Sequence, residues 1–198
     1  MKKLICYSIL AGSMLSAIAG VAAPVPQDQV NRSARALSQK SIDHITKEVR
    51  HELVMLPFYG VFDNLAYQVD ADGTVTLVGQ VSRPTLKSDA ENAVKRIEGV
   101  DKVVNNIEVL PTSMNDDRIR RDTYRAIFGN DVLSPYQLRA VPPIHIIVNN
   151  GHVTLEGAVA SQIDKQIAGV QANQVQGTFS VTNNLRVDEQ DNKEQSKK

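Results

Sequence analysis

Hydrophobic and polar positions along this chain follow the order helix, strand, strand, helix, strand, and the order then repeats. Apolar residues recur at helical spacing from Ile42 to Leu56, and we expect Ser41, just before them, to be the N-cap. After the turn signal Asp72-Gly73, valine and leucine alternate with threonine, which is typical of a hairpin strand. The expected elements of the first unit are a helix at 41–56, strands at 65–69 and 74–81, a helix that begins at Pro84, and a strand at 102–110.

A second copy of this pattern follows at a fixed spacing, which places Asn150 on Asp72 and Val187 on Val109. Residues 72–109 match residues 150–187 without a gap, and 13 of the 38 aligned positions are identical. The same spacing places Pro57 on Pro135, so we read it as continuing upstream of the turn. The expected elements of the second unit are a helix at 116–128, strands at 144–148 and 152–159, a helix at 162–176, and a strand at 180–187. The predicted fold class is therefore α+β, with two tandem α-β-β-α-β units, each a three-stranded mixed sheet packed against two helices.

The identical positions include three pairs of glycines, which we assign to turns and packing. Two glycines of each unit flank one strand and lack the strand-loop-helix context of a nucleotide site, so a phosphate-binding loop is disfavoured. The six structural glycines are Gly73, Gly79, Gly99, Gly151, Gly157 and Gly177.

The N-terminus has the composition of a signal peptide, with two lysines, an apolar run and small residues at a cleavage position near Ala23. The run is shorter than the ~20 residues that a bilayer span needs, which disfavours a retained anchor. Cys6 is the only cysteine and lies inside this run, so we expect a mature chain without disulfides, thiol catalysis or cysteine-bound metal. The expected organisation is a signal peptide at 1–23, a linker at 24–40, domains at 41–110 and 115–188, and a disordered tail at 189–198.

Charge argues against one class of partner. Without Lys2 and Lys3 the chain has 20 basic and 22 acidic residues, a balance that disfavours nucleic-acid binding through bulk phosphate attraction. The second unit is the less acidic, with seven basic and seven acidic residues at 115–188 against seven and eleven at 41–110. Four of its arginines lie in the predicted helix that opens it: Arg118, Arg120, Arg121 and Arg125.

The sequence contains no catalytic or metal-binding constellation that we recognise. The four histidines are divided between the units, without a cysteine or close carboxylate partner, and we interpret them as surface residues: His44, His51, His145 and His152. No G-x-S-x-G elbow and no pair of acidic residues beside a histidine occurs in the mature chain. We therefore expect neither enzymatic activity nor a cofactor or metal.

Two asparagines stand out among the polar residues of the last strands. Strand alternation places Asn105 on the same face as Val103 and Ile107, and Asn183 lies at the matching position of the second unit. A buried amide must find hydrogen-bond partners. We expect each amide to bond a helix C-cap or a backbone group at a strand end, and a contact with a ligand remains the alternative.

Both units share the pattern dG-x-V-T-L-x-G-x-V, an alanine-bearing helix and then G-V-x-x-V-x-N-x-[IL]-x-V, although the second unit has Thr178 in place of a valine. The first unit carries it at Gly73, Val75, Leu77, Gly79, Val81, Ala90, Gly99, Val100, Val103, Asn105, Ile107 and Val109. In these residues each unit resembles the BON domain, a module of osmotically inducible and other bacterial envelope proteins. The resemblance covers most of 41–188 and implies a non-enzymatic periplasmic protein that associates with phospholipid or the outer membrane and maintains the envelope under stress.

The arginine-bearing helix is the predicted binding surface. Each arginine near anionic lipid contributes about 1 kcal/mol, so charge alone gives a dissociation constant of order millimolar, and an apolar insertion has to add to it. The candidate residues for contact with lipid or a partner are Arg118, Arg121, Arg125, Phe128, Leu133 and Tyr136. The predicted partner is a membrane phospholipid surface or an envelope protein or polymer, with the oligomeric state left open. The alternative is a periplasmic chaperone or adaptor that holds client proteins on an open sheet face or an edge strand.

Overall fold

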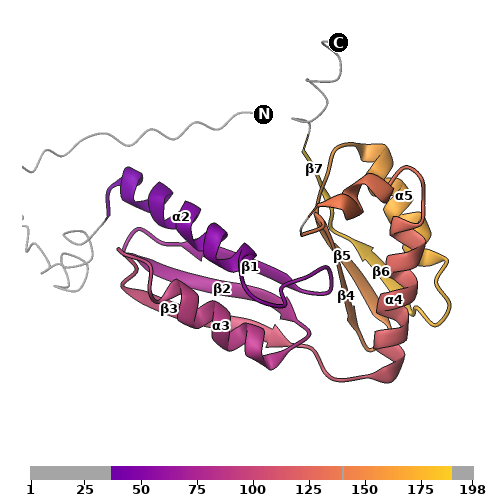
Figure 1. The fold of residues 1–198 in the computed structure, drawn as a ribbon, viewed down its shortest axis with the longest axis horizontal. Coiled ribbons are helices and arrows are strands. Elements are labelled where there is room, and N and C mark those ends of the chain that lie inside the picture. The colour runs from indigo at the N-terminus through magenta and orange to yellow at the C-terminus, as the bar shows by residue number, and fades with distance from the viewer. Residues whose placement is uncertain (1–36, 140, 189–198) are drawn as a thin grey trace, which may run out of the picture. The chain divides into compact units, whose positions relative to one another are not determined.

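The computed structural model describes residues 37–139 and 141–188 (Figure 1). The predicted signal peptide at 1–23, most of the linker at 24–40 and the tail at 189–198 lie outside the described residues and stay predictions. The described chain forms two α+β units in succession.

The first unit opens with a helix that starts earlier than predicted. Helix α2 spans Gln39–Val54, and its N-cap is Ser38, whose Oγ accepts the Ser41 N–H at 3.2 Å. The prediction that Ser41 is the N-cap is wrong, because the helix already begins two residues before it. The other elements are β1 (Asn64–Val69), β2 (Thr74–Val81), α3 (Pro84–Val94) and β3 (Lys102–Val109).

These elements form a helix layer on a mixed sheet of order β1-β2-β3. β1 runs antiparallel to β2, and β3 runs parallel to β2. Apolar residues at helical spacing place one stripe of α2 and of α3 against the sheet. The buried residues of this core are Ile45, Val49, Leu53, Val75, Leu77, Val81, Leu86, Ala90, Val94 and Ile107.

The second unit repeats the architecture and divides its last strand. Its elements are α4 (Met114–Phe128), the 3₁₀ helix η1 (Ser134–Leu138), β4 (Ile144–Asn149), β5 (His152–Val159), α5 (Gln162–Asn173), β6 (Ser180–Asn183) and β7 (Arg186–Val187). β4 is antiparallel to β5, whereas β6 and β7 each pair parallel with β5, so the predicted strand at 180–187 is interrupted. Two tandem α-β-β-α-β units with mixed sheets confirm the predicted fold class.

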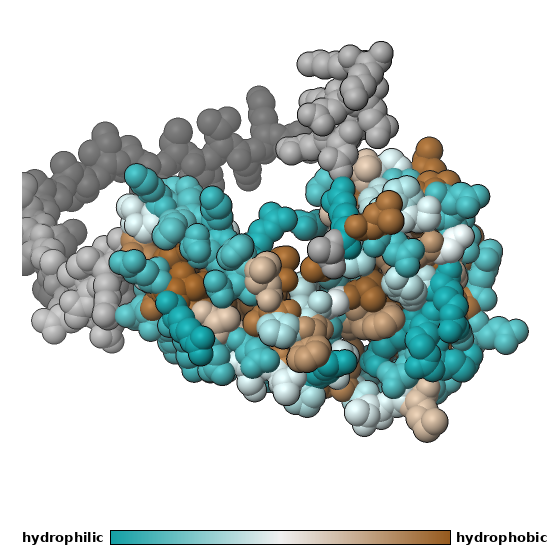
Figure 2. Space-filling model, viewed as in Figure 1, coloured by the Kyte–Doolittle hydropathy of each residue, from teal (hydrophilic) through white to brown (hydrophobic). Residues whose placement is uncertain are grey.

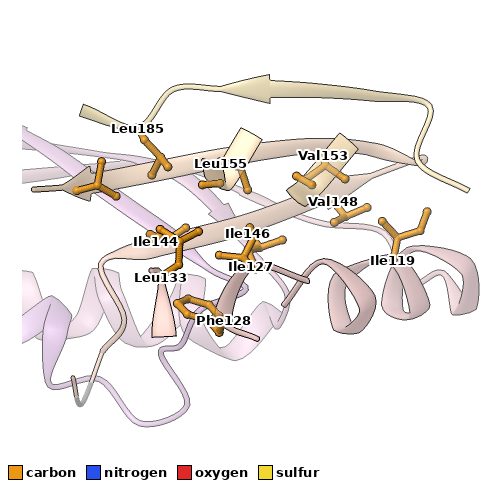
Figure 3. Packing of buried hydrophobic residues seen from close by; sticks show 13 residues of the cluster. Ile119, Ile127, Phe128, Leu133, Ile144, Ile146, Val148, Val153, Leu155 and Leu185 are labelled. Atoms are coloured by element: carbon orange, nitrogen blue, oxygen red, sulfur yellow. The ribbon is translucent and has the colours of Figure 1, made fainter. Parts of the chain in front are cut away.

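The core of the second unit lies between its sheet and the two helices α4 and α5. Figure 3 shows Ile119, Ile127 and Phe128 on the helix side, facing the β4 residues Ile146 and Val148. Every residue of β4 except the last is buried. Because both faces of this strand are covered, its sequence is nearly continuously apolar and does not alternate.

The constant spacing between the repeats holds only downstream of the hairpin turn. Gly99 and Gly177 are equivalent glycines of the two repeats. A Cβ on Gly99 would meet Ile45, and a Cβ on Gly177 would meet Ile119, so the two isoleucines occupy equivalent positions in their units. The spacing that aligns the residues downstream of the turn does not pair these isoleucines. We align the first helices of the two units on this pair, Ile45 with Ile119, and call that alignment the helix register. The alignment of Pro57 with Pro135 is therefore wrong. The physical reason is a longer connection between helix and first strand in the second unit, which also contains η1.

All six repeat glycines adopt positive φ, with values of 83° at Gly73, 124° at Gly79, 90° at Gly99, 79° at Gly151, 115° at Gly157 and 86° at Gly177. Gly79 and Gly157 are the most restricted. A Cβ would lie 2.1 Å from the Asn64 carbonyl oxygen in one unit and 2.0 Å from the Pro143 carbonyl oxygen in the other. Only glycine combines this φ with so close a neighbouring backbone.

Candidate functional site

Helix α4 presents an exposed basic face. Arg118 donates to Asn115 Oδ1 at 3.2 Å and to Asp122 Oδ2 at 3.5 Å, and Arg125 donates to Asp122 Oδ1 at 2.9 Å. Arg121 is exposed and has no hydrogen bond or ion pair with any described residue. Figure 2 shows mainly hydrophilic residues over α4. Surface ion pairs of this kind are weak, so these guanidinium groups can exchange Asp122 for another anion.

Arg120 is not part of this face. Its side chain is buried between α4 and β4, where Nη1 donates to Asp117 Oδ1 at 2.6 Å and Nη2 donates to the Val148 carbonyl at 2.8 Å. The Arg120 Nε is buried without a partner among the described residues. This arginine therefore joins α4 to the sheet and serves the fold.

The apolar residues predicted to insert into a membrane require correction. Phe128 is 4% exposed and Leu133 is 0% exposed, because the chain after α4 folds back and closes the end of the core. Neither side chain is available to a lipid surface in this fold. Of the apolar residues in that loop, Val132 remains partly exposed.

Tyr136 also has a structural position. Its hydroxyl donates to Asp164 Oδ2 at 2.7 Å and accepts the Ala160 N–H at 2.8 Å, which ties η1 to the start of α5. Burial, the largest effect, raises the pKa of Tyr136 to about 12, and the Asp164 carboxylate acts in the same direction. The phenol therefore stays protonated and keeps its donor role at ordinary pH.

Two exposed apolar side chains that the sequence analysis did not select lie near the start of α4. Met114 is 92% exposed and Phe179 is 80% exposed. Met114 lies one helical turn before Arg118 in α4. A Cβ on Gly177 would lie 2.5 Å from the Arg118 guanidinium, so the Arg118 side chain lies over the loop that leads to Phe179. The Phe179 ring packs edge-on against His152, with centroids 4.9 Å apart. We call Met114, Arg118, His152 and Phe179 the unit 2 tip.

The equivalent end of the first unit has the same backbone and different chemistry. The Asp101 N–H donates to the Gly73 carbonyl at 2.9 Å, just as the Phe179 N–H donates to the Gly151 carbonyl at 2.7 Å. In the helix register, Lys40 stands where the second unit has Met114. The first unit thus has charged residues at both positions where the second unit has exposed apolar ones. This difference between the repeats was visible in the sequence and is the signal that identifies Phe179.

The two repeat asparagines bond to backbone, as predicted, but to different groups. Asn105 Nδ2 donates to the Lys87 carbonyl at 2.9 Å, and Asn183 Nδ2 donates to the Lys165 carbonyl at 2.7 Å. These carbonyls lie within α3 and α5, so the amides join strand to helix and do not form a C-cap. The Asn105 amide also donates to Glu91 Oε2 at 3.0 Å. Hydrogen bonds of Glu91 to Lys95 and then to Asn105 hold the pKa of that carboxyl below its usual value.

The histidines do not all lie at the surface. His145 is buried, so its interpretation as a surface residue is wrong; its ring stacks on Tyr59, with centroids 5.6 Å apart, and Nδ1 is 3.3 Å from the Gly60 carbonyl oxygen. Within 37–139 and 141–188, no group of three or more His, Cys, Asp and Glu side chains is arranged to hold a metal ion. In the same residues, no helix has both the length and the apolar character that crossing a membrane requires.

The repeated fold and the exposed tip define a tandem module with a candidate interaction surface. The sequence matches the BON domain family at residues 41–111 and again at 115–189, and the chain belongs to this family. The family is linked to membrane and envelope association, and its proteins are typically periplasmic or envelope-associated.

Comparison with curated proteins gave no match. Among solved structures, the chain is similar to the C-terminal domain of CdsD, the structural protein of the Type III secretion system of Chlamydia trachomatis, with 13% identity, a TM-score of 0.29, and coverage of 76% of this chain and 99% of that one. A second CdsD structure matches with 12% identity, a TM-score of 0.28, and coverage of 77% and 97%. Similarity at this level carries no argument about function.

Proposed function

We propose that this chain is a non-enzymatic periplasmic binding module whose second unit attaches to anionic phospholipid and thereby supports envelope integrity or stress tolerance. The observation that carries the proposal is the unit 2 tip, where Met114 and Phe179 project beside Arg118. Exposed apolar side chains next to cationic ones are typical of surfaces that bind at the membrane interface, where the apolar groups insert and the cations contact lipid phosphates.

The magnitudes favour a surface that combines both kinds of contact. Arg118, Arg121 and Arg125 together contribute about 3 kcal/mol near anionic lipid, which corresponds to a dissociation constant of order millimolar. Partial burial of Met114 and Phe179 among acyl chains adds roughly 3 kcal/mol more, which moves the constant to about tens of micromolar. Binding should therefore weaken when either contribution is removed.

Sedimentation with vesicles tests this proposal. Wild-type protein is expected to sediment with vesicles that contain phosphatidylglycerol and to stay in solution with pure phosphatidylcholine. The double variant Met114→Lys and Phe179→Asp carries the residues that the first unit has at these positions, so the backbone tolerates them. Unchanged sedimentation of this variant, or of Arg118/Arg121/Arg125→Glu, would refute the assigned surface.

A second candidate function is that of a periplasmic chaperone or adaptor, and one observation favours it. β3 is an eight-residue strand at the edge of its sheet, paired with β2 on one side only among the described residues. An open edge of this length can accept an extended client segment. Suppression of client aggregation by purified protein without lipid would favour this function over lipid attachment.

A further inference from the structure

A hollow of about 360 Å³ at the linker between the units gathers three guanidinium groups. Arg83, the N-cap of α3, lines it just after β2, and Arg120 and Arg121 line it from α4. Asp117 is the only carboxylate among the described residues that line it, and Thr112 contributes a hydroxyl. The hollow contains none of the apolar residues of the unit 2 tip, so it is a separate feature of the surface.

The local course of the chain brings these residues together. The Leu110 N–H donates to the Val81 carbonyl at 2.9 Å, which keeps the chain that leaves β3 beside the end of β2. Ser113 caps α4 only three residues later, so the first two turns of α4 must lie close to Arg83. The hollow thus follows from a short linker.

A buried carboxylate fixes the wall that carries Arg83. Asp63 Oδ1 accepts the Ser82 N–H at 2.7 Å and the Ser82 hydroxyl at 2.8 Å. The Arg83 guanidinium then lies 4.9 Å from the centroid of the Phe58 ring. Stacking on an aromatic face leaves the N–H groups at the edge of a guanidinium free to bind an anion.

Charge in the hollow is only partly balanced. Asp117 already pairs with Arg120 at 2.6 Å. Arg83 and Arg121 have no carboxylate partner among the described residues. Two such cations that line the same hollow repel each other, and an anion between them removes that repulsion. The planar fork of each guanidinium matches the oxygens of a phosphate.

We infer that this hollow binds a phosphate group, with Arg83 and Arg121 as its cationic contacts and the Thr112 hydroxyl as a further donor. The site goes beyond the proposed membrane contact, because it depends on an arginine of the first unit. The phosphate can belong to a lipid headgroup or to a soluble phosphate monoester, since both present the same oxygens.

Titration of the purified exported protein with inorganic phosphate and with glycerol 3-phosphate, followed by backbone amide NMR shifts, tests the inference. Saturable shifts are expected at Arg83, Thr112 and Arg121. Arg83→Gln and Arg121→Gln should each weaken binding roughly tenfold, the usual effect of losing a charge-assisted hydrogen bond. Arg96→Gln is the matched control, because Arg96 is an exposed arginine of the first unit that lines a different hollow.

A vesicle arm with phosphatidylglycerol in phosphatidylcholine distinguishes the two sources. If Arg83→Gln also weakens vesicle binding, the phosphate is that of a lipid headgroup; if only the soluble probes lose affinity, it is a soluble phosphate. Both results support the site. Absence of saturable shifts with every probe, or an equal loss in Arg96→Gln, would overturn it. Arg121 belongs to both proposed surfaces, so the variants that separate them are Phe179→Asp, which tests the membrane contact alone, and Arg83→Gln, which tests the hollow alone.

Discussion

Asp116 fixes the hairpin turn of the second unit at Gly151: its Oδ1 accepts the Gly151 N–H at 2.9 Å, and its Oδ2 accepts the neighbouring N–H of Asn150 at 2.9 Å. The carboxylate is buried at the start of α4, where the positive end of the helix dipole stabilises it. At the equivalent position in the helix register, the first unit has Ile42. The second unit therefore has its own clamp between α4 and the turn beneath Phe179.

Replacing Asp116 by asparagine should destabilise the protein. An amide has one acceptor oxygen, so one of the two turn N–H groups, which are part-buried at Asn150 and buried at Gly151, would lose its partner, at a cost of about 1–3 kcal/mol in the free energy of unfolding. Urea unfolding measures this loss. Asp131→Asn is the control, because Asp131 is exposed, and it should leave the free energy within about 0.5 kcal/mol. Equal effects of the two changes would contradict the clamp.

Gly157→Ala should be among the most damaging small substitutions in the chain. The new Cβ would lie 2.0 Å from the Pro143 carbonyl oxygen at a φ of 115°, so the strands must move apart or the backbone must change conformation. We expect a loss of about 2 kcal/mol or more by thermal or urea unfolding. At Gly60, an added Cβ meets nothing within 4 Å, so Gly60→Ala should be nearly neutral. A neutral Gly157→Ala would refute the steric argument.

Asn105→Ala separates a structural amide from a ligand contact. The change removes the bonds to the Lys87 carbonyl and Glu91, so the free energy of unfolding should fall by about 1–3 kcal/mol without any ligand present. The neighbouring Asn106 is exposed, and Asn106→Ala serves as the control. If unfolding is unchanged in Asn105→Ala, the amide has no structural role and the ligand contact becomes the better interpretation.

His145 should make stability depend on pH. Burial lowers the pKa of His145 below its usual value, against smaller opposing effects of the Gly60 and Asp63 backbone and of the Asp63 and Glu156 carboxylates. The unfolded chain, with a pKa of about 6.5, then binds this proton more tightly than the folded one. Its contribution is complete above about pH 6.5 and is lost as pH falls through the folded pKa. The free energy of unfolding should therefore decrease on acidification from neutral pH.

Urea unfolding across this range, with His145→Gln beside wild type, measures that dependence. His145→Gln should flatten the decrease, whereas His152→Gln should not, since His152 is exposed. An unaltered slope in His145→Gln would assign the pH dependence to other groups.

Sequence patterns located the β-strands well and the loops poorly, for physical reasons. The strands at 74–81 and 152–159 follow a turn signal and begin with alternating apolar and polar residues, and their observed bounds agree with the prediction. Upstream, the connection between helix and strand differs in length between the units, and loop length leaves no periodic trace in a sequence. A single spacing therefore failed there.

The candidate site was predicted in part. The arginine face follows from helical periodicity, since Arg118, Arg121 and Arg125 recur every three to four residues. Burial of Phe128 and Leu133 could not be predicted, because an apolar residue after a helix can close the core or extend from it. The sequence does contain a signal for Phe179 as a contact residue, because the first repeat has the charged Asp101 at the aligned position.

The most direct test of the central claim places a fluorescent reporter at the unit 2 tip. The chain contains no tryptophan, so Phe179→Trp introduces a single reporter. Leu138→Trp is the control, since Leu138 is 87% exposed in η1, after the other end of α4. With phosphatidylglycerol vesicles, the proposed contact predicts blue-shifted emission and protection from an aqueous quencher at position 179 and neither at position 138. Unchanged emission at 179, or equal changes at both positions, would contradict it.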